Sequence, residues 1–279
     1  MKITVTGGTG FIGNYVVEEL LRKDLDVIVI GKNIQKAKNK YWFSKVEFIE
    51  SDINKMPTDD IMHKIASSDK LIHLAWSGLP NYKELFHFEE NLLPQYFFLK
   101  KLTQLGLADI TITGTCLEYG MRNGCLTTDM LSDPQNPYSL AKDTLRKFLQ
   151  QLQLTTPFYL KWIRLFYMYG KGQSENSILS QLDKALLENE PVFNMSGGEQ
   201  LRDYMSVEMV AENIVLAALT DETNKLENCC SGKPISIRSL VENHLRTKEQ
   251  SIQLNLGYYA YPQYEPMAFW GDVDDNSNQ

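Results

Sequence analysis

Three glycines spaced three residues apart, Gly7, Gly10 and Gly13, constrain the fold of this chain most. The β-branched segment 2–5 precedes them, and apolar residues recur at helical spacing over 15–21. This order predicts a strand, a glycine loop and a helix. Such a loop lets the backbone approach a pyrophosphate, which the free N–H groups at the helix start, including those of Phe11 and Ile12, can bind. The alternative is an ordinary glycine turn.

Length and charge narrow the class of protein. A chain of 279 residues can fill one large α/β core with a smaller lobe attached. A net charge of −7 argues against a general affinity for nucleic acid or for an anionic membrane. The first residues enter a strand and no apolar run approaches the ~20 residues that span a bilayer, so we expect no signal peptide and a cytoplasmic protein.

Cysteine and histidine are sparse. The four cysteines, Cys116, Cys125, Cys229 and Cys230, form no C-x-x-C pair, and the chain has only four histidines. We therefore expect neither a metal site nor a disulfide framework.

The end of the second predicted strand, 26–30, bears on the cofactor. NAD-selective enzymes usually carry Asp or Glu at this point to hold the ribose 2′-hydroxyl, whereas this chain has Gly31 followed by Lys32. The absence of a carboxylate at this point favours NADP(H), with Lys32 binding the 2′-phosphate, and leaves NAD(H) possible. Lys32 could instead be a solvated turn residue.

Two further strands, 46–49 and 71–75, complete the predicted cofactor edge. Asp52, followed by Ile53, could accept a hydrogen bond from the adenine amino group or cap the next helix. Leu74 and Ala75 end the other strand, at the carboxyl edge where open α/β sheets bind ligands. His73 lies inside that apolar run and is interpreted as a packed core residue.

Residues 82–105 have a helical pattern rich in aromatic residues, and Pro94 should kink the helix. So many aromatic side chains would be costly in water, which makes a self-association face plausible and predicts a homodimer. Helices are also expected over 178–190, 207–219 and 237–245.

A fifth strand, 109–113, leads to Thr115 and Cys116, and Pro137 suits the start of the next helix. Tyr138 and Lys142 are four residues apart on that helix, so they share one face. The ammonium should lower the tyrosine pKa toward the range of an acid/base catalyst and could bind a cofactor ribose. A hydroxyl such as that of Thr115 could bind the substrate oxygen.

Together these motifs resemble the extended short-chain dehydrogenase/reductase family, in its nucleotide-sugar epimerase/dehydratase branch. Segments 164–170 and 197–204 continue the similarity. The resemblance implies a Rossmann-like, doubly wound parallel sheet over residues 1–169 that binds NAD(P). It also implies a smaller nucleotide-sugar lobe over 170–279, although the chain could cross back between them.

The resemblance further implies a catalytic triad of Thr115, Tyr138 and Lys142. Thr115, Cys116 and Tyr138 would contact substrate, and Arg202 would bind its diphosphate. A planar guanidinium suits phosphate oxygens, but Arg202 could instead pair with Asp203 or another carboxylate.

Two departures of this sequence from the patterns of related enzymes narrow the possible reactions. Dehydratases of this branch resemble one another in carrying Asp-Glu directly after the catalytic threonine, where this chain has Cys116 and Leu117. Leucine cannot transfer a proton, so dehydration is disfavoured, and Glu118 could point away. Enzymes that epimerise C3 and C5 use a cysteine where Leu117 stands.

What remains is NADPH-dependent reduction of a 4-keto sugar or 4-epimerisation with retained NAD. The tract 255–271 is similar to bacterial reductases of dTDP-4-keto-6-deoxy sugars. A non-catalytic NADP-binding sensor is the alternative from another class.

Overall fold

The computed structural model describes residues 1–220, 223–261 and 265–273. Its main sheet has seven strands, β1 (Lys2–Thr6), β2 (Asp26–Gly31), β3 (Glu47–Glu50), β4 (Lys70–His73), β5 (Asp109–Thr115), β7 (Tyr159–Leu165) and β11 (Lys225–Cys229). They lie in the order β11-β7-β5-β4-β1-β2-β3, and every pairing is parallel. The predicted doubly wound parallel sheet is confirmed. Strand order reverses between β1 and β4, where such sheets bind ligands.

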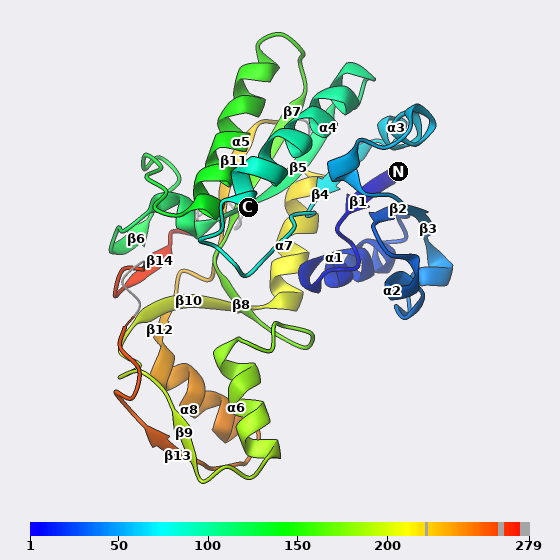
Figure 1. Ribbon diagram of the computed structural model, residues 1–279. Coiled ribbons are helices and arrows are strands. Elements are labelled where there is room, and N and C mark those ends of the chain that lie inside the picture. The colour runs from blue at the N-terminus through cyan, green and yellow to red at the C-terminus, as the bar shows by residue number, and fades with distance from the viewer. Residues whose placement is uncertain (221–222, 262–264, 274–279) are drawn as a thin grey trace.

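Helices cover both faces of this sheet (Figure 1). One face carries α1 (Phe11–Arg22), α2 (Ile34–Lys38) and α7 (Val207–Leu219), whose apolar residues Val16, Ala37 and Ile214 share one core cluster with the sheet. The other carries α3 (Asp59–Ala66), α4 (Leu93–Gln104) and α5 (Pro137–Gln153), which contribute Met62, Phe98 and Leu145 to a second cluster. Burial of both faces explains why the strands read as continuous apolar runs.

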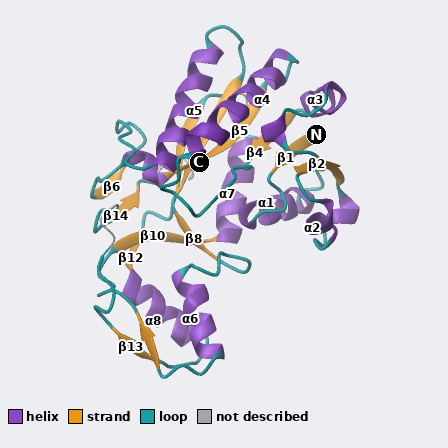
Figure 2. Cartoon of the chain, viewed as in Figure 1, coloured by secondary structure: helices purple, strands orange, loops and turns teal. Residues whose placement is uncertain are grey.

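A smaller part of the chain lies beside the carboxyl edge of the sheet (Figure 2). It contains α6 (Ile178–Leu187), α8 (Ile237–Thr247) and seven short strands: β8 (Tyr167–Tyr169), β10 (Leu201–Ser206), β12 (Pro234–Ser236), β9 (Val192–Asn194), β13 (Gln253–Asn255), β6 (Gly124–Leu126) and β14 (Phe269–Gly271). Because α7 and β11 return to the main sheet, the chain crosses between the two parts. The boundary at residue 169 between a cofactor-binding part and a nucleotide-sugar lobe therefore remains a proposal.

The predicted helix over 82–105 is wrong at its start. A π-helical turn over His87–Leu92 precedes α4, and Pro94 stands in the first turn of α4, so the kink expected there stays a prediction. Proline is tolerated in the first turn of a helix because its missing N–H has no helical partner there. Since Pro94 cannot donate a hydrogen bond to the preceding turn, that turn can adopt the wider π-helical form. The other predicted helices are present, and α5 begins at Pro137 with the Asn136 side chain as its cap.

All four cysteines are free thiols. Within the described ranges, no cluster of three or more metal-ligating side chains occurs, and no helix is long and apolar enough to cross a membrane. Residues 262–264 of the tract that resembles sugar reductases lie outside the described residues.

Candidate active site

The glycine loop lies tightly against α1 and the end of β4. Gly7 has a φ of +76°, and a Cβ added there would lie 2.8 Å from the backbone nitrogen of Ala75. A Cβ on Gly13 would lie 2.2 Å from the carbonyl oxygen of Gly7. Gly10 caps α1, so the N–H groups of Phe11 and Ile12 open the helix beside this cradle. Only glycine allows this tight turn between β1, the end of β4 and the start of α1, where the helix N–H groups can bind an anion.

The residues predicted for the adenosine side also lie together. Lys32 Nζ is 3.0 Å from Asp52 Oδ1 and 3.1 Å from Ser77 Oγ. The Asp52 carboxylate accepts a hydrogen bond from the Asn54 N–H as well, so it caps the following turn. The Ile53 side chain belongs to the core, which leaves its backbone for any ligand. Lys32 is thus paired with the Asp52 carboxylate.

His73 is fully buried, as predicted. Its ring stacks on Phe98, and its nitrogens lie 2.9 Å from Thr6 Oγ1 and 2.6 Å from Gln95 Oε1. Burial, with the charge of Lys142, lowers the pKa of His73 to about 3. The ring is therefore neutral at physiological pH.

The structure brings Thr115 and Tyr138 together at the carboxyl edge of the sheet. Thr115 ends β5, Tyr138 lies in the first turn of α5, and both side chains are buried. Burial, then the nearby Tyr82, Glu118 and Cys116, raises the pKa of Tyr138 well above its usual value, and only the hydrogen bond from Thr115 opposes this. The predicted lowering of the Tyr138 pKa by Lys142 is wrong, because burial of the phenol dominates.

Lys142 is also buried, and its ammonium lies against aromatic rings. Its Nζ is 4.6 Å from the centre of the Trp76 ring and 5.4 Å from that of Trp162. Burial lowers the pKa of Lys142 to about 8, and the charge of Glu118 acts in the opposite direction. The ammonium can therefore gain or lose a proton near neutral pH.

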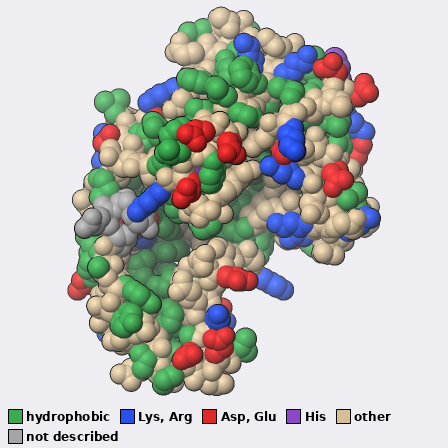
Figure 3. Space-filling view, in the orientation of Figure 1, with side chains coloured by type: hydrophobic (Ala, Val, Ile, Leu, Met, Phe, Trp, Pro, Cys, Tyr) green, Lys and Arg blue, Asp and Glu red, His purple; other side chains and the backbone are tan. Residues whose placement is uncertain are grey.

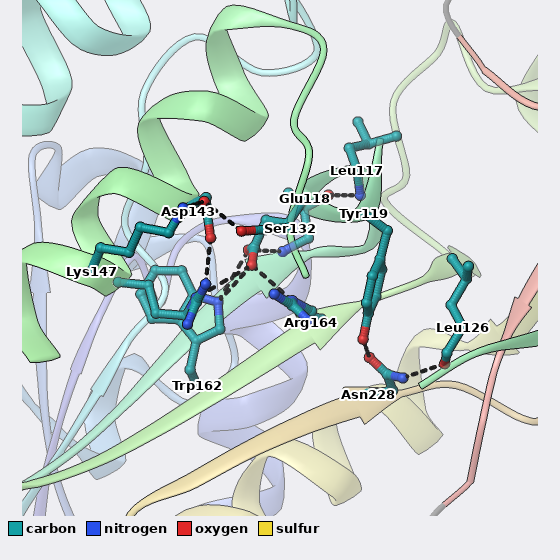
Figure 4. A network of polar contacts seen from close by, with 12 residues as sticks. Leu117, Glu118, Tyr119, Leu126, Ser132, Asp143, Lys147, Trp162, Arg164 and Asn228 are labelled. Carbon is teal, nitrogen blue, oxygen red and sulfur yellow. Dashed lines mark hydrogen bonds and ion pairs between the residues drawn. The ribbon is translucent and has the colours of Figure 1, made fainter. Parts of the chain in front are cut away.

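Glu118 lies in a buried polar network with Trp162 and Arg164 (Figure 4). Its carboxylate accepts hydrogen bonds from the Thr115 N–H at 2.9 Å and from Trp162 Nε1 at 3.0 Å, and Arg164 Nε lies 2.8 Å away. The Thr115 hydroxyl accepts from the Leu117 N–H, which completes a capping box. Glu118 fixes the turn that presents Thr115 and is no proton donor to substrate.

Arg202 is buried in the smaller part of the chain, against Glu265. Its Nη2 lies 3.0 Å from Glu265 Oε2, and its guanidinium stands 4.5 Å from the Phe269 ring centre. Glu265 also accepts from the Tyr167 hydroxyl at 2.8 Å. Arg202 is therefore paired with a carboxylate. That carboxylate is not Asp203, which instead accepts from the N–H groups of Ser231 and Gly232.

Cys116 connects the two halves of the site. It is buried beside Thr115 and belongs to the same apolar cluster as Phe269, whose ring contacts the Arg202 guanidinium. Burial raises the pKa of the Cys116 thiol well above its usual value, which keeps it protonated. A hollow containing hydrophobic side chains separates the large sheet from the smaller lobe on the visible face (Figure 3).

Several residues of this site were not assigned a role from the sequence: Trp76, Tyr82, His87, Trp162, Tyr167 and Glu265. Trp76 had one usable signal, because it directly follows the end of a buried strand. The others reach the site through tertiary packing, as when the Tyr138 ring lies 5.2 Å from His87 and 5.4 Å from Tyr82. No local pattern marks such contacts.

Comparisons with known proteins agree with this geometry. Residues 3–229 match the model of the NAD dependent epimerase/dehydratase family. The chain is 32% identical over 274 residues to dTDP-6-deoxy-L-talose 4-dehydrogenase (NAD(+)) of Aggregatibacter actinomycetemcomitans, covering 97% of this chain and 99% of the relative.

Two solved structures share the fold. A UDP-N-acetylglucosamine 4-epimerase from Methanobrevibacter ruminantium M1 superposes with a TM-score of 0.85 at 23% identity, over 99% of this chain and 90% of that one. A UDP-glucuronic acid 4-epimerase from Bacillus cereus, in complex with UDP-glucuronic acid and NAD, gives 0.82 at 23% identity over 99% and 92%.

Proposed function

Because the chain belongs to the NAD dependent epimerase/dehydratase family, we propose that it transfers hydride at C4 of a nucleoside-diphosphate 6-deoxyhexose. The direction is reduction of a 4-keto group by NADPH or NADH, and the nucleotide is dTDP. The similarity to a dTDP-6-deoxy-L-talose 4-dehydrogenase, which extends over nearly both whole chains, supports this choice of sugar position and nucleotide.

The observation that carries the proposal is the buried set Thr115, Tyr138 and Lys142 beside the glycine cradle. Glycine at 7 and 13 lets this turn pack against the end of β4 and the start of α1, and the N–H groups of Phe11 and Ile12 at that helix start suit a dinucleotide pyrophosphate. When bound, the reduced nicotinamide supplies the hydride. The positions that carry an acid and a base in dehydratases hold Cys116 and Leu117, so loss of water has no proton donor there.

The three members of the set have different tasks. The Tyr138 hydroxyl donates its proton to the C4 oxygen, and its raised pKa keeps it protonated until hydride arrives. The Thr115 hydroxyl binds the same oxygen as charge develops on it. Lys142, whose pKa is about 8, holds the cofactor ribose and stabilises the phenolate left after proton transfer.

Arg202 binds the substrate diphosphate in this proposal. Because Glu265 pairs with Arg202, a diphosphate would share the guanidinium with this carboxylate or replace one of its oxygens. The guanidinium keeps a charge-assisted pair in either case. A carboxylate oxygen released in this way can then accept from a sugar hydroxyl.

The cofactor choice depends on Lys32. We propose that NADPH is accepted, since no carboxylate stands at Gly31 to repel a 2′-phosphate. Lys32 would exchange its pairing with Asp52 for one with the 2′-phosphate, because an exposed ammonium is attracted more strongly by a doubly charged anion. NAD(H) needs no such exchange, and the dehydrogenase relative is named for NAD(+).

A homodimer is proposed from the outer surface of α4 and α5. Large apolar side chains stand exposed there, namely Leu93, Phe97, Leu140 and Phe148. Tyr96 of α4 contacts Phe148 of α5, so the two helices form one continuous surface. A second copy of the chain would remove this surface from water.

The test is turnover of dTDP-4-keto-6-deoxyhexose, followed by the absorbance of reduced nicotinamide. We expect stoichiometric cofactor oxidation by the native enzyme. The Tyr138→Phe variant should lose at least about a hundredfold in kcat while it still binds cofactor. Tyr41→Phe, at an exposed tyrosine, is the matched control. Sugar turnover without net cofactor oxidation would favour a 4-epimerase, and full activity of Tyr138→Phe would refute the mechanism.

A further inference from the structure

A chain of buried hydrogen bonds begins at the backbone just before Trp76. The Ala75 N–H donates to Thr6 Oγ1 at 3.3 Å, and Thr6 Oγ1 lies 2.9 Å from His73 Nδ1. His73 Nε2 lies 2.6 Å from Gln95 Oε1. Because His73 is neutral, one assignment satisfies all of these atoms: the Thr6 hydroxyl donates to Nδ1, and Nε2–H donates to Gln95.

The chain then returns to the backbone just after Trp76. Gln95 Nε2 donates to Asn54 Oδ1 at 2.6 Å, and Asn54 Nδ2 donates to Asn91 Oδ1 at 3.0 Å. Asn91 Nδ2 donates to the Ser77 carbonyl oxygen at 3.0 Å. Every donor points in the same direction along the chain, and the backbone is therefore held on both sides of Trp76.

The indole of Trp76 is held as well. Its Nε1–H donates to His87 Nδ1 at 3.0 Å, and the two rings stack with an interplanar angle of 18°. Since Nδ1 accepts, His87 carries its proton on Nε2 and donates to the Asn81 carbonyl oxygen at 2.9 Å. Burial lowers the pKa of His87, which favours this neutral form.

The second indole near Lys142 is fixed in the same way. Trp162 Nε1–H donates to the buried carboxylate of Glu118, so the orientation of its ring is set (Figure 4). Within the described residues, no carboxylate forms an ion pair with Lys142. The Lys142 ammonium instead lies over the rings of Trp76 and Trp162. An ammonium is attracted by the face of an indole ring.

We propose that Trp76 is a positioning residue that holds the Lys142 ammonium beside Tyr138 through a cation–π contact, with Trp162 as the second ring. The inference rests on the proposed function, because it gives Lys142 its task. It adds that the faces of two indole rings stabilise the ammonium form of this active-site lysine. Trp76 also contacts the Tyr138 ring edge-on at 6.2 Å, so one indole fixes both side chains.

Three other titratable groups bear on Lys142. Glu118 favours the ammonium from the turn after β5, whereas the neutral His73 on β4 adds no charge at physiological pH. Tyr138, on the same helix, remains a neutral phenol until it gives up its proton. None of them changes when the electron density of the Trp76 ring is altered, so that ring can be tested alone.

The experiment replaces Trp76 by mono-, di- and trifluorotryptophan through nonsense suppression. Fluorine weakens the negative face of the ring and leaves its shape almost unchanged, so neither water entry nor unfolding is introduced. The Lys142 pKa is followed by NMR of lysine labelled with carbon-13 at Cε, and the resonance is assigned by its loss in Lys142→Met. We expect the pKa to fall stepwise with fluorine number, by about 0.5 to 1.5 pH units in total.

The same fluorinated series at Trp42 is the matched control, because that indole is buried and donates to Asn14 on α1, away from Lys142. It should leave the Lys142 pKa unchanged. A Lys142 pKa that is the same across the Trp76 series overturns the inference. The titration needs no substrate, so absence of sugar turnover would refute the proposed function and leave this result standing.

Discussion

Replacing Lys142 by methionine should stabilise the protein while it removes the activity. Burial lowers the pKa of this lysine from 10.5 to about 8, so the folded state disfavours the charged form that the unfolded state prefers. That difference corresponds to about 3 kcal/mol at neutral pH. The two indole faces offset part of it, by about 0.5 to 1 kcal/mol each. A net gain of about 1 to 2 kcal/mol in the free energy of unfolding follows, since methionine fills a similar volume.

The pH dependence of this gain has a definite sign. The cost of burying Lys142 is fully present below its folded pKa of about 8, and it disappears as the pH rises toward 10.5, where the unfolded lysine also loses its proton. The advantage of Lys142→Met over the native protein should therefore be largest near neutral pH and smallest at about pH 10.

Urea unfolding of the native protein and of Lys142→Met at several pH values measures this gain in the free energy of unfolding. Lys184→Met, at an exposed position, is the control. A Lys142→Met variant that is less stable than the native protein, or a gain that does not change with pH, would refute the reasoning.

Three further predictions concern other parts of the molecule. Lys32→Ala should lower kcat/KM with NADPH by about tenfold to a hundredfold and leave the value with NADH almost unchanged, because only the phosphate needs the ammonium; equal losses with both cofactors in steady-state assays would contradict this. Glu118→Gln should lower the free energy of unfolding by about 3 to 5 kcal/mol in urea, since Arg164 is left buried without its counter-charge; a loss under about 1 kcal/mol would show that Gln replaces the carboxylate well. Phe97→Glu should convert a dimer to a monomer by light scattering, whereas Leu187→Glu on exposed α6 should not; two variants of equal mass would argue against the α4 and α5 surface.

The sequence was informative where a local pattern determines the structure. The spacing of Gly7, Gly10 and Gly13 requires close backbone contacts that only glycine allows, and the structure has them. Pro137 after Asn136 marks the start of α5, because the Asn136 side chain caps the helix and Pro137 needs no N–H bond in its first turn. The separation of Tyr138 and Lys142 then places them on one face.

Long-range packing set the features that the sequence left open. Arg202 and Glu265 meet across 63 positions of the chain, so the carboxylate partner of Arg202 had no local signal. The direction of the Tyr138 pKa depends on how deeply the loop before α4 buries the phenol, which periodicity does not report. Trp76 meets Lys142 only because β4 and α5 converge at the same edge of the sheet.

The most direct test of the account is isotope transfer from reduced cofactor deuterated at nicotinamide C4. Incubation with dTDP-4-keto-6-deoxyhexose should place one deuterium on the sugar C4 for each cofactor oxidised, as read by NMR of the product. The Tyr138→Phe variant should transfer almost none. A sugar product that carries no deuterium, or that forms while the reduced cofactor is not consumed, would contradict net hydride transfer to C4.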